Sequence, residues 1–304
     1  MRPLSIPSST SFFTSFSTSF FLGPKDAGLI PDNDPSPAPF GNLAPTAAQA
    51  AIISLAQRTK LKRGAFRPWM SRLVNLLRSG PVDVTYQGAA FRFYHQASAT
   101  ERGALFNPDY NREELDFLRG YVPAGGSFID VGANVGTYAL PLARHAGPGG
   151  RVIAIEPHPV THARLAFNRA ASGLTQVTLV AAAAGDADGD LMIETDGDNL
   201  GASHVVTGQA SVHAIKVPAR TLQGILGDYR LSRVDALKID VEGFEDRVLT
   251  GFFATAPQTL WPRAVVIEHL SRSEWQADCI ADMMQRGYAE AGKTRSNTFL
   301  ARSS

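Results

Sequence analysis

The sequence predicts an α/β fold built on a parallel sheet with helices on both faces. Short apolar strands alternate with helices from Ser127 onward, a glycine-rich turn follows the first strand, and several strands end in an acidic residue. Short apolar strands separated by helices are typical of parallel sheets that are buried on both faces. Ligands of such sheets bind beyond the carboxyl ends of the strands, where the strand order reverses.

The elements follow one another in a regular order. After a helix at residues 111–120, with acids in its first turn and glycine at its end, the alternation begins with the strand SFIDV. The predicted elements that follow are a helix at 138–145, strand RVIAIE, a helix at 159–171 and strand QVTLVAAA at 176–183. Further along, DALKID is the fourth parallel strand and leads through VEGFE into a helix, and VVIEH is the fifth strand.

The chain divides into three segments by composition. Residues 1–45 are rich first in Ser, Thr and Phe and then in Pro, without a period of 2 or 3.6, which predicts a disordered low-complexity arm. A signal peptide is the alternative, although Ser and Thr interrupt its apolar pairs. Residues 46–110 are predicted to be a helical and hairpin extension, with Thr46 as a helix cap. Residues 111–304 are predicted to form the α/β domain.

Charge and cysteine content restrict the possible functions. The net charge of +1 excludes a chain built as a whole to hold a polyanion. The single cysteine, Cys279, suits a reducing compartment, so a cytoplasmic location is expected. The basic run at 58–78 contains no acid. It is either a peripheral contact for a membrane or an acidic partner, or a solvated face on helices that cover the catalytic domain, and solvated faces are commoner.

The glycine-rich turn GANVG, residues 132–136, is the main ligand-binding signal. Glycines there let a ligand approach the backbone without Cβ clashes, and the following helix offers free N–H groups. Glu156 ends the next strand, where a carboxylate can accept hydrogen bonds from both hydroxyls of a ribose. The turn therefore predicts a nucleoside ligand, and a tight turn with incidental acids is the alternative.

The identity of that nucleoside depends on Asn134 and Asp130. Asn134 replaces the middle glycine of the dinucleotide fingerprint, which admits a pyrophosphate. Asp130 precedes the turn, and an acid there repels phosphate but can hold an ammonium group. S-adenosylmethionine has an amino-acid moiety, a sulfonium and a ribose but no phosphate, so it fits better than NAD. The expected cofactor-binding residues are Asp130, Gly132, Asn134, Gly136, Glu156 and Asp186.

Two further stretches can be explained either by ligand binding or by ordinary turn formation. Asp186, in AGDADG, is expected to accept from the adenine amino group, although turn formation explains this stretch almost as well. In GDNLGASH, residues 197–204, the side chains of Asn199, Ser203 and His204 either line the cleft or belong to an ordinary hairpin loop.

Five stretches occur together in one order: FIDVGANVGTYAL, GRVIAIEPHP, AAAAGDADGD, VDALKIDVEGFEDRVLTG and VVIEHL. In this combination the sequence resembles the FkbM family of S-adenosylmethionine-dependent methyltransferases, from about residue 82 to the end. The resemblance implies a Rossmann-like class I methyltransferase fold with a mostly parallel seven-stranded sheet. It also implies O-methylation of a hydroxyl on a sugar, polysaccharide or secondary metabolite.

Methylation of an alcohol requires a group that removes its proton. The stretch KIDVEGFED, residues 238–246, places four acids close together at a strand end, and such clusters mark functional sites. Asp240, Glu242 and His269 are the candidate catalytic residues, although His269 also fits an ordinary strand-end histidine. A cation held by Asp240, Glu242 and Glu268 is the competing mechanism, and a metal-free site is the prediction.

Other functions fit the sequence less well. A nicotinamide-dependent oxidoreductase needs a third glycine and a Tyr-x-x-x-Lys pair, and neither occurs near the turn. A cytosine methyltransferase needs a nucleophilic cysteine, but Cys279 lies in a helix-like run, and the basic residues lie outside the core, so no nucleic-acid partner is expected. A non-catalytic nucleoside-binding Rossmann protein is the remaining alternative.

Overall fold

The computed structural model describes residues 36–196, 199–206 and 214–302, with the side chains of 195–204 also outside the description. By its internal contacts the chain divides into residues 1–34 and one compact unit, Pro35–Ser304. The following description concerns that unit. Within the described ranges, every helix is too short or too polar to cross a membrane.

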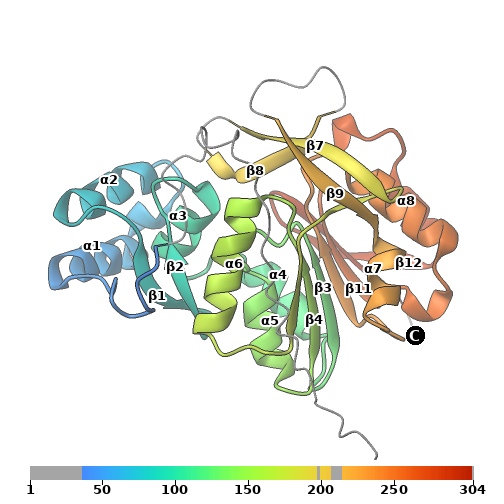
Figure 1. Ribbon diagram of the computed structural model, residues 1–304, viewed down its shortest axis with the longest axis horizontal. Coiled ribbons are helices and arrows are strands. Elements are labelled where there is room, and N and C mark those ends of the chain that lie inside the picture. Colours follow the sequence, from blue (N-terminus) through green and yellow to red (C-terminus); the bar gives the residue numbers. More distant parts are fainter. Residues whose placement is uncertain (1–35, 197–198, 207–213, 303–304) are drawn as a thin grey trace, which may run out of the picture. The chain divides into compact units, whose positions relative to one another are not determined.

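A seven-stranded sheet forms the centre of the unit (Figure 1). Its order is β12-β13-β11-β10-β3-β4-β5, in which β13 runs antiparallel to both of its neighbours and the pairs from β11 to β5 are parallel. The strands are β3 (Ser127–Val131), β4 (Arg151–Ile155), β5 (Val177–Val180), β10 (Ala236–Ile239), β11 (Ala264–Glu268), β12 (Tyr288–Lys293) and β13 (Asn297–Arg302). The predicted mostly parallel seven-stranded sheet is confirmed.

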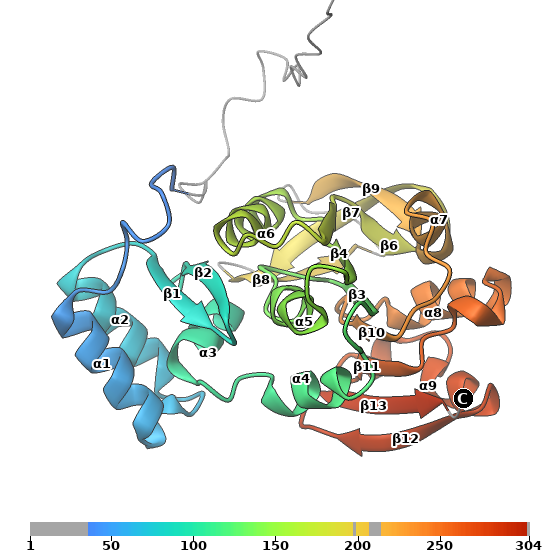
Figure 2. The same ribbon diagram turned by 90° about the horizontal axis from the view of Figure 1, so that it is seen from below.

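Helices lie on both faces of this sheet (Figure 2), and a hydrophobic core fills the space on each face. Successive residues of β3 belong to opposite cores, since Phe128 packs in one and Ile129 in the other. The first core includes residues of α4 (Arg112–Arg119), α5 (Ala139–Ala146) and α6 (Pro159–Ala171). The second includes residues of α7 (Leu222–Asp228), α8 (Glu245–Thr255) and α9 (Cys279–Gln285). Burial on both faces explains why the strands are continuously apolar.

The N-terminal part of the unit contains three helices and a hairpin. They are α1 (Ala47–Arg58), α2 (Arg67–Leu77), β1 (Val82–Tyr86), β2 (Ala89–Phe93) and α3 (Ala99–Phe106). The predicted cap is confirmed, because Thr46 and Gln49 form a reciprocal capping box at the start of α1. The hairpin pairs as predicted around Gln87 and Gly88. Short 3₁₀ turns occur at Lys60–Lys62, Gln258–Leu260 and Arg272–Glu274.

Two buried ion pairs stabilise this N-terminal part, one between α3 and α6 and one within the hairpin. Arg164 of α6 lies 2.7 Å from Glu101 of α3, and both side chains are buried. In the hairpin, Arg92 pairs with Asp83 at 2.7 Å and also donates to the carbonyl of Ser36. Removing one partner of a buried pair typically costs about 3–5 kcal/mol. The Arg164–Glu101 pair therefore holds α3 against α6, and the Arg92–Asp83 pair joins the two strands of the hairpin.

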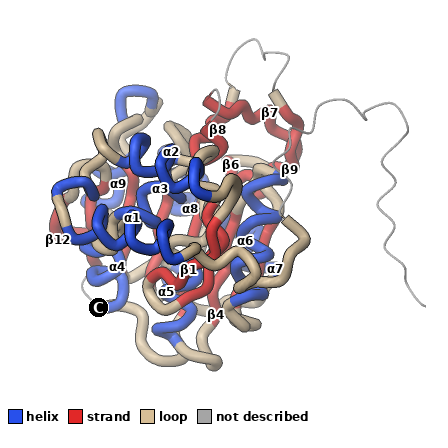
Figure 3. Tube along the Cα trace, turned by 90° about the vertical axis from the view of Figure 1, so that its left-hand side faces the viewer, coloured by secondary structure: helices blue, strands red, loops and turns tan. Residues whose placement is uncertain are grey.

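A second sheet of four strands follows β5 (Figure 3). Its order is β6-β9-β7-β8, with β6 (Ala183–Gly185), β7 (Gly189–Asp196), β8 (Asn199–Val205) and β9 (Ile215–Thr221). The predicted strand 176–183 is wrong at its end, because β5 stops at Val180 and Ala183 already belongs to this sheet. The alanine run lacks the β-branched side chains that favour a continuous strand. The stretch GDNLGASH contributes strand β8, not a loop, and its side chains lie outside the described part.

Candidate functional site

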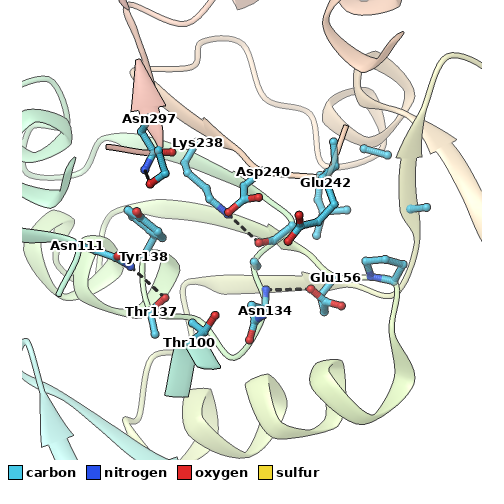
Figure 4. A pocket seen from close by; sticks show the side chains of 18 of the residues that line it. Thr100, Asn111, Asn134, Thr137, Tyr138, Glu156, Lys238, Asp240, Glu242 and Asn297 are labelled. Carbon is cyan, nitrogen blue, oxygen red and sulfur yellow. Dashed lines mark hydrogen bonds and ion pairs between the residues drawn. The ribbon is translucent and has the colours of Figure 1, made fainter. Parts of the chain in front are cut away.

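A cavity of about 170 Å³ lies at the carboxyl ends of β3, β4 and β10 (Figure 4). The chain runs from β3 outward to β5 and returns to the other side of β3 at β10, so the strand order reverses here. This is the position at which doubly wound sheets bind ligands. The wall includes the expected residues Gly132, Asn134, Glu156, Asp240 and Glu242.

The glycine turn packs directly on the end of β10. Gly132 has φ +73°, and a Cβ atom there would lie 1.9 Å from the carbonyl oxygen of Asp240. Asn134 has φ +50°, a left-handed conformation that asparagine tolerates better than most residues. The N–H groups of Gly132 and Ala133 both donate to the carbonyl of Ile155. Only glycine therefore fits at position 132 of this turn.

Glu156 supplies a buried carboxylate to the cavity wall. It accepts hydrogen bonds at 2.9 Å from the backbone N–H groups of Asn134 and His158. Burial raises the pKa of Glu156 to about 7, although these two N–H groups act in the opposite direction. Each oxygen keeps a further lone pair, so hydroxyl donors from a ligand would stabilise the charged form. These properties fit a carboxylate that receives ribose hydroxyls.

Asp130 is completely buried and is not part of the cavity wall. One of its oxygens accepts from the N–H of Ala139, at the start of α5, and the other lies 3.6 Å from Lys238 Nζ. Burial raises the pKa of Asp130 although the Lys238 ammonium opposes this effect. The structure therefore places the Lys238 ammonium beside Asp130, and it does not bring Asp130 to the ligand cavity.

Lys238 of β10 connects the turn with Asp240, which directly follows this strand. Its Nζ donates to the carbonyl of Gly132 at 2.8 Å and lies 3.7 Å from Asp240 Oδ2. Burial acts to lower the pKa of Lys238, but the carboxylates of Asp240 and Asp130 raise it overall. Lys238 therefore stays charged, and its positive charge offsets the negative charges of both Asp130 and Asp240.

Asp240 and Glu242 are the two acids of this strand end that line the cavity. The Asp240 side chain is 37% exposed. Glu242 has φ +53°, and strained backbone of this kind clusters at functional sites. Burial, together with the nearby charges of Asp240 and Glu268, raises the pKa of Glu242 to about 7. A carboxylate with this pKa is well matched to accept a proton near neutral pH.

Two further carboxylates, those of Glu245 and Glu268, approach Asp240 beside the cavity. One oxygen atom from each of Asp240, Glu245 and Glu268 lies within 4.8 Å of the other two. The candidate cation site therefore contains Glu245 where Glu242 was predicted. Glu245 accepts from Val241 N–H at 2.7 Å and from Trp275 Nε1 at 2.8 Å. Glu268 likewise accepts backbone N–H groups just after β11. The carboxylate oxygens of Glu245 and Glu268 thus already accept hydrogen bonds that hold the neighbouring loops in place.

Asp130 and Gly136 do not line the cavity, and two further expected site residues also lie away from the wall. His269 Nδ1 is 3.0 Å from Thr298 Oγ1, so its ring is directed to β13. Asp186 is exposed after β6, and its Cα lies near Gly251 of α8. Neither residue lines the cavity. The early end of β5 explains the position of Asp186, since the chain has already entered the second sheet.

Other wall residues come from segments without a motif. Thr100 of α3 and Asn111, just before α4, extend the wall from the N-terminal side (Figure 4). Asn297, at the start of β13, lines it from the other side and donates to Glu114 at 3.1 Å. The Tyr138 ring lies 5.3 Å from Lys238 Nζ. These residues are far apart in the sequence. The only sequence signal for them is weak: some are polar residues near the ends of helices or strands.

Comparisons with solved structures find low-identity likenesses over about two thirds of the chain. A methyltransferase from Geobacter sulfurreducens is 14% identical, covering 64% of this chain and 79% of that chain with a TM-score of 0.41. Precorrin-6y C5,15-methyltransferase from Geobacter metallireducens is 13% identical, covering 64% of this chain and 90% of that chain with a TM-score of 0.40. An rRNA methylase from Streptococcus thermophilus is 10% identical, covering 63% of this chain and 95% of that chain with a TM-score of 0.38. At these TM-scores the likenesses carry no argument about function.

A search of curated proteins finds no match. The family model described as the methyltransferase FkbM domain matches residues 130–289, which is more than half of the chain. The matched region begins at Asp130 and includes Glu156 and the acids Asp240 and Glu242 that follow β10. The sheet order and the helices on both faces give this region the Rossmann-like class I methyltransferase fold. The chain therefore belongs to the FkbM methyltransferase family.

Proposed function

We propose that this protein transfers the methyl group of S-adenosylmethionine to a hydroxyl oxygen of a sugar, polysaccharide or secondary metabolite. The observation that carries the proposal is the pair of carboxylates, Asp240 and Glu242, in the wall of the cavity that Glu156 also lines. S-adenosylmethionine supplies an electrophilic methyl group on a positively charged sulfur, which leaves as a neutral thioether. The proposed acceptor is a small molecule or a glycan, and no nucleic-acid acceptor is proposed.

The residues of the wall divide the work of binding and proton removal. Glu156 accepts the two ribose hydroxyls, and the bare backbone at Gly132 permits close approach of the ligand. Asp240 accepts a hydrogen bond from a second hydroxyl of the acceptor and so orients the reacting one. Glu242 takes the hydroxyl proton while the oxygen forms its bond to the methyl carbon and the carbon–sulfur bond breaks. Lys238 limits the repulsion between Asp240 and the buried Asp130.

The first expected result concerns cofactor binding. Glu156→Ala should weaken the binding of S-adenosylmethionine by about 1.5–3 kcal/mol, because a charged hydrogen-bond acceptor is lost. Isothermal titration calorimetry on the folded variant measures this change. Asp186→Ala is the matched control, since Asp186 is exposed and lies outside the wall, and it should bind like the parent. Unchanged affinity in Glu156→Ala would remove Glu156 from the site.

The second expected result concerns metal dependence. Turnover should survive exhaustive dialysis against EDTA, because Glu245 and Glu268 already accept N–H donors and leave only a sparse oxygen shell for a hard cation. EDTA saturated beforehand with Ca²⁺ serves as the control for non-specific effects. Loss of turnover that added Mg²⁺ restores would instead assign a cation to Asp240, Glu245 and Glu268.

The proposed reaction itself is tested with a radiolabelled methyl donor. Panels of sugars, polysaccharides and metabolites are incubated with the protein, and label recovered as an acid-stable, base-stable ether supports O-methylation. Parallel titrations with NAD and S-adenosylmethionine test the two alternatives. NAD binding without S-adenosylmethionine binding would favour an oxidoreductase, and S-adenosylmethionine binding without transfer to any acceptor would favour a non-catalytic binding protein.

A further inference from the structure

Exposed apolar side chains are concentrated on the N-terminal helices. Of the nine large hydrophobic residues that are exposed in the described part of the chain, six lie between residues 55 and 77. They are Leu55, Phe66, Trp69, Leu73, Leu76 and Leu77. Together with the exposed cations Arg58, Lys60, Arg63 and Arg72, they form what we call the α1–α2 surface. Isolated exposed apolar residues are normal, but a contiguous group marks an interaction surface.

Helix α2 carries apolar residues on both of its faces. Ser71 and Val74 are buried toward the rest of the unit. On the outer face, Trp69, Leu73 and Leu76 follow one another at the spacing of one helical stripe. The Trp69 side chain is 65% exposed and that of Leu76 is 82% exposed. The side chains of the outer stripe therefore do not contribute to the intramolecular core, and a binding partner could bury them.

Along the sequence, the charges that flank this stripe are all of one sign. No acid occurs between residues 47 and 82. Among the described residues, none of the four exposed cations forms an ion pair. The other basic residues of the run are engaged within the protein, as in the 2.9 Å pair of Lys62 with Asp109. Arg72 lies 5.5 Å from the Trp69 ring, so cation and aromatic residue share one face.

We propose that the α1–α2 surface docks on the surface of an anionic lipid bilayer. In this arrangement α2 lies parallel to the membrane, with Trp69, Leu73 and Leu76 among the headgroups and the cations beside the lipid phosphates. A basic face around an apolar stripe with tryptophan is the pattern of interfacial helices. The eleven residues of α2 are too few to span a bilayer, so the helix rests on it.

Two other occupants fit the surface less well. A nucleic acid would satisfy the cations but would leave the apolar stripe in water, because its phosphate backbone offers little apolar surface. A second copy of the chain would place four unpaired cations against the same four, because two-fold interfaces are self-complementary. The membrane satisfies both the charge and the apolar stripe, and the proposal requires no assumption about the methyl acceptor.

Vesicle flotation with the full chain tests the proposal. The protein should float with phosphatidylcholine vesicles in which about a third of the lipid is phosphatidylglycerol, and binding should weaken as salt is added. Arg63→Glu with Arg72→Glu should lower the lipid partition coefficient by about fivefold for each positive charge removed, and further through the new negative charges. Trp69→Ser with Leu76→Ser should lower it about tenfold or more.

Matched controls separate docking from loss of folding. Met284→Ser removes an exposed apolar residue of α9, and Arg263→Glu reverses an exposed charge just before β11, both outside the α1–α2 surface. Both controls should float like the parent, and all variants should keep its thermal midpoint because the changed side chains are exposed.

The proposal is overturned by any of four results. The first two are no flotation of the parent and equal flotation with pure phosphatidylcholine. The third is parent-like binding by Arg63→Glu with Arg72→Glu or by Trp69→Ser with Leu76→Ser. The fourth is a dimer in light scattering that Trp69→Ser with Leu76→Ser disrupts. Salt-sensitive binding of duplex DNA with no flotation would assign the cations to nucleic acid and would also overturn it.

Discussion

Glu242→Gln is expected to lower turnover about 10²–10⁴-fold, which is the usual contribution of a general base. The amide keeps the shape of the side chain but cannot take the proton of the acceptor hydroxyl. Binding of S-adenosylmethionine should be largely retained, because Glu156 supplies the carboxylate proposed for the ribose. Single-turnover transfer of radiolabelled methyl to the acceptor, with titration calorimetry of the cofactor, measures both quantities.

The pH dependence gives a second readout of the same residue. The base is active when deprotonated, so kcat/KM for the acceptor should rise with pH and level off above the pKa of Glu242. That pKa is about 7 in the protein without ligand, and the positive sulfonium should move it downward because it favours the carboxylate. With the donor saturating, this rise should disappear in Glu242→Gln.

Control variants decide between the acids of the strand end. The pKa of Glu245 is also raised to about 7, mainly by burial, but Glu245 does not line the cavity. Glu245→Gln should therefore keep the pH-dependent rise, and His269→Ala should have a small effect because its ring faces Thr298. If Glu242→Gln keeps both turnover and the rise while Asp240→Asn loses them, the base is Asp240.

The fold was largely predictable because its signals are local. Each parallel strand is a short apolar run bounded by a turn, and α6 has the bounds that the pattern predicts, Pro159–Ala171. The second sheet was not predicted, because its first strand, Ala183–Gly185, is short and lies in an alanine run without strand propensity. Its pairing with β9 depends on residues more than thirty positions away.

The candidate site was predictable only where a motif marks it. Gly132, Glu156, Asp240 and Glu242 stand at strand ends, so the topology alone brings them together. The partner of Asp130 depends instead on strand register. Lys238 is directly opposite Asp130 in the parallel pair of β3 and β10, and this register places a charged partner where the sequence predicted a ligand ammonium.

Gly132→Ala is expected to destabilise the protein by about 4 kcal/mol or more. The added methyl group would lie 1.9 Å from the carbonyl oxygen of Asp240, and neither backbone segment can move aside by a simple rotation. Gly125→Ala is the matched control, because Gly125 has the same φ of +73° but its nearest neighbour would be 3.8 Å away. The control should cost only about 1 kcal/mol, from the left-handed backbone.

Thermal unfolding of the two variants separates the clash from the backbone strain. At this chain size about 1 kcal/mol corresponds to a shift of about 2–4 °C, so Gly132→Ala should melt roughly 10 °C or more below the parent and Gly125→Ala only a few degrees below it. Equal shifts in the two variants would show that the contact with Asp240 is not tight.

The position of the clash also has a catalytic consequence. The methyl group of Gly132→Ala pushes on the backbone carbonyl of Asp240, which lies two positions before Glu242. Well below its melting temperature, the folded fraction of this variant should therefore show reduced cofactor affinity and reduced turnover together. Gly125→Ala should keep both, since Gly125 is not part of the cavity wall. A folded Gly132→Ala protein with normal turnover would show that the glycine turn and the acids of β10 can separate without loss of function.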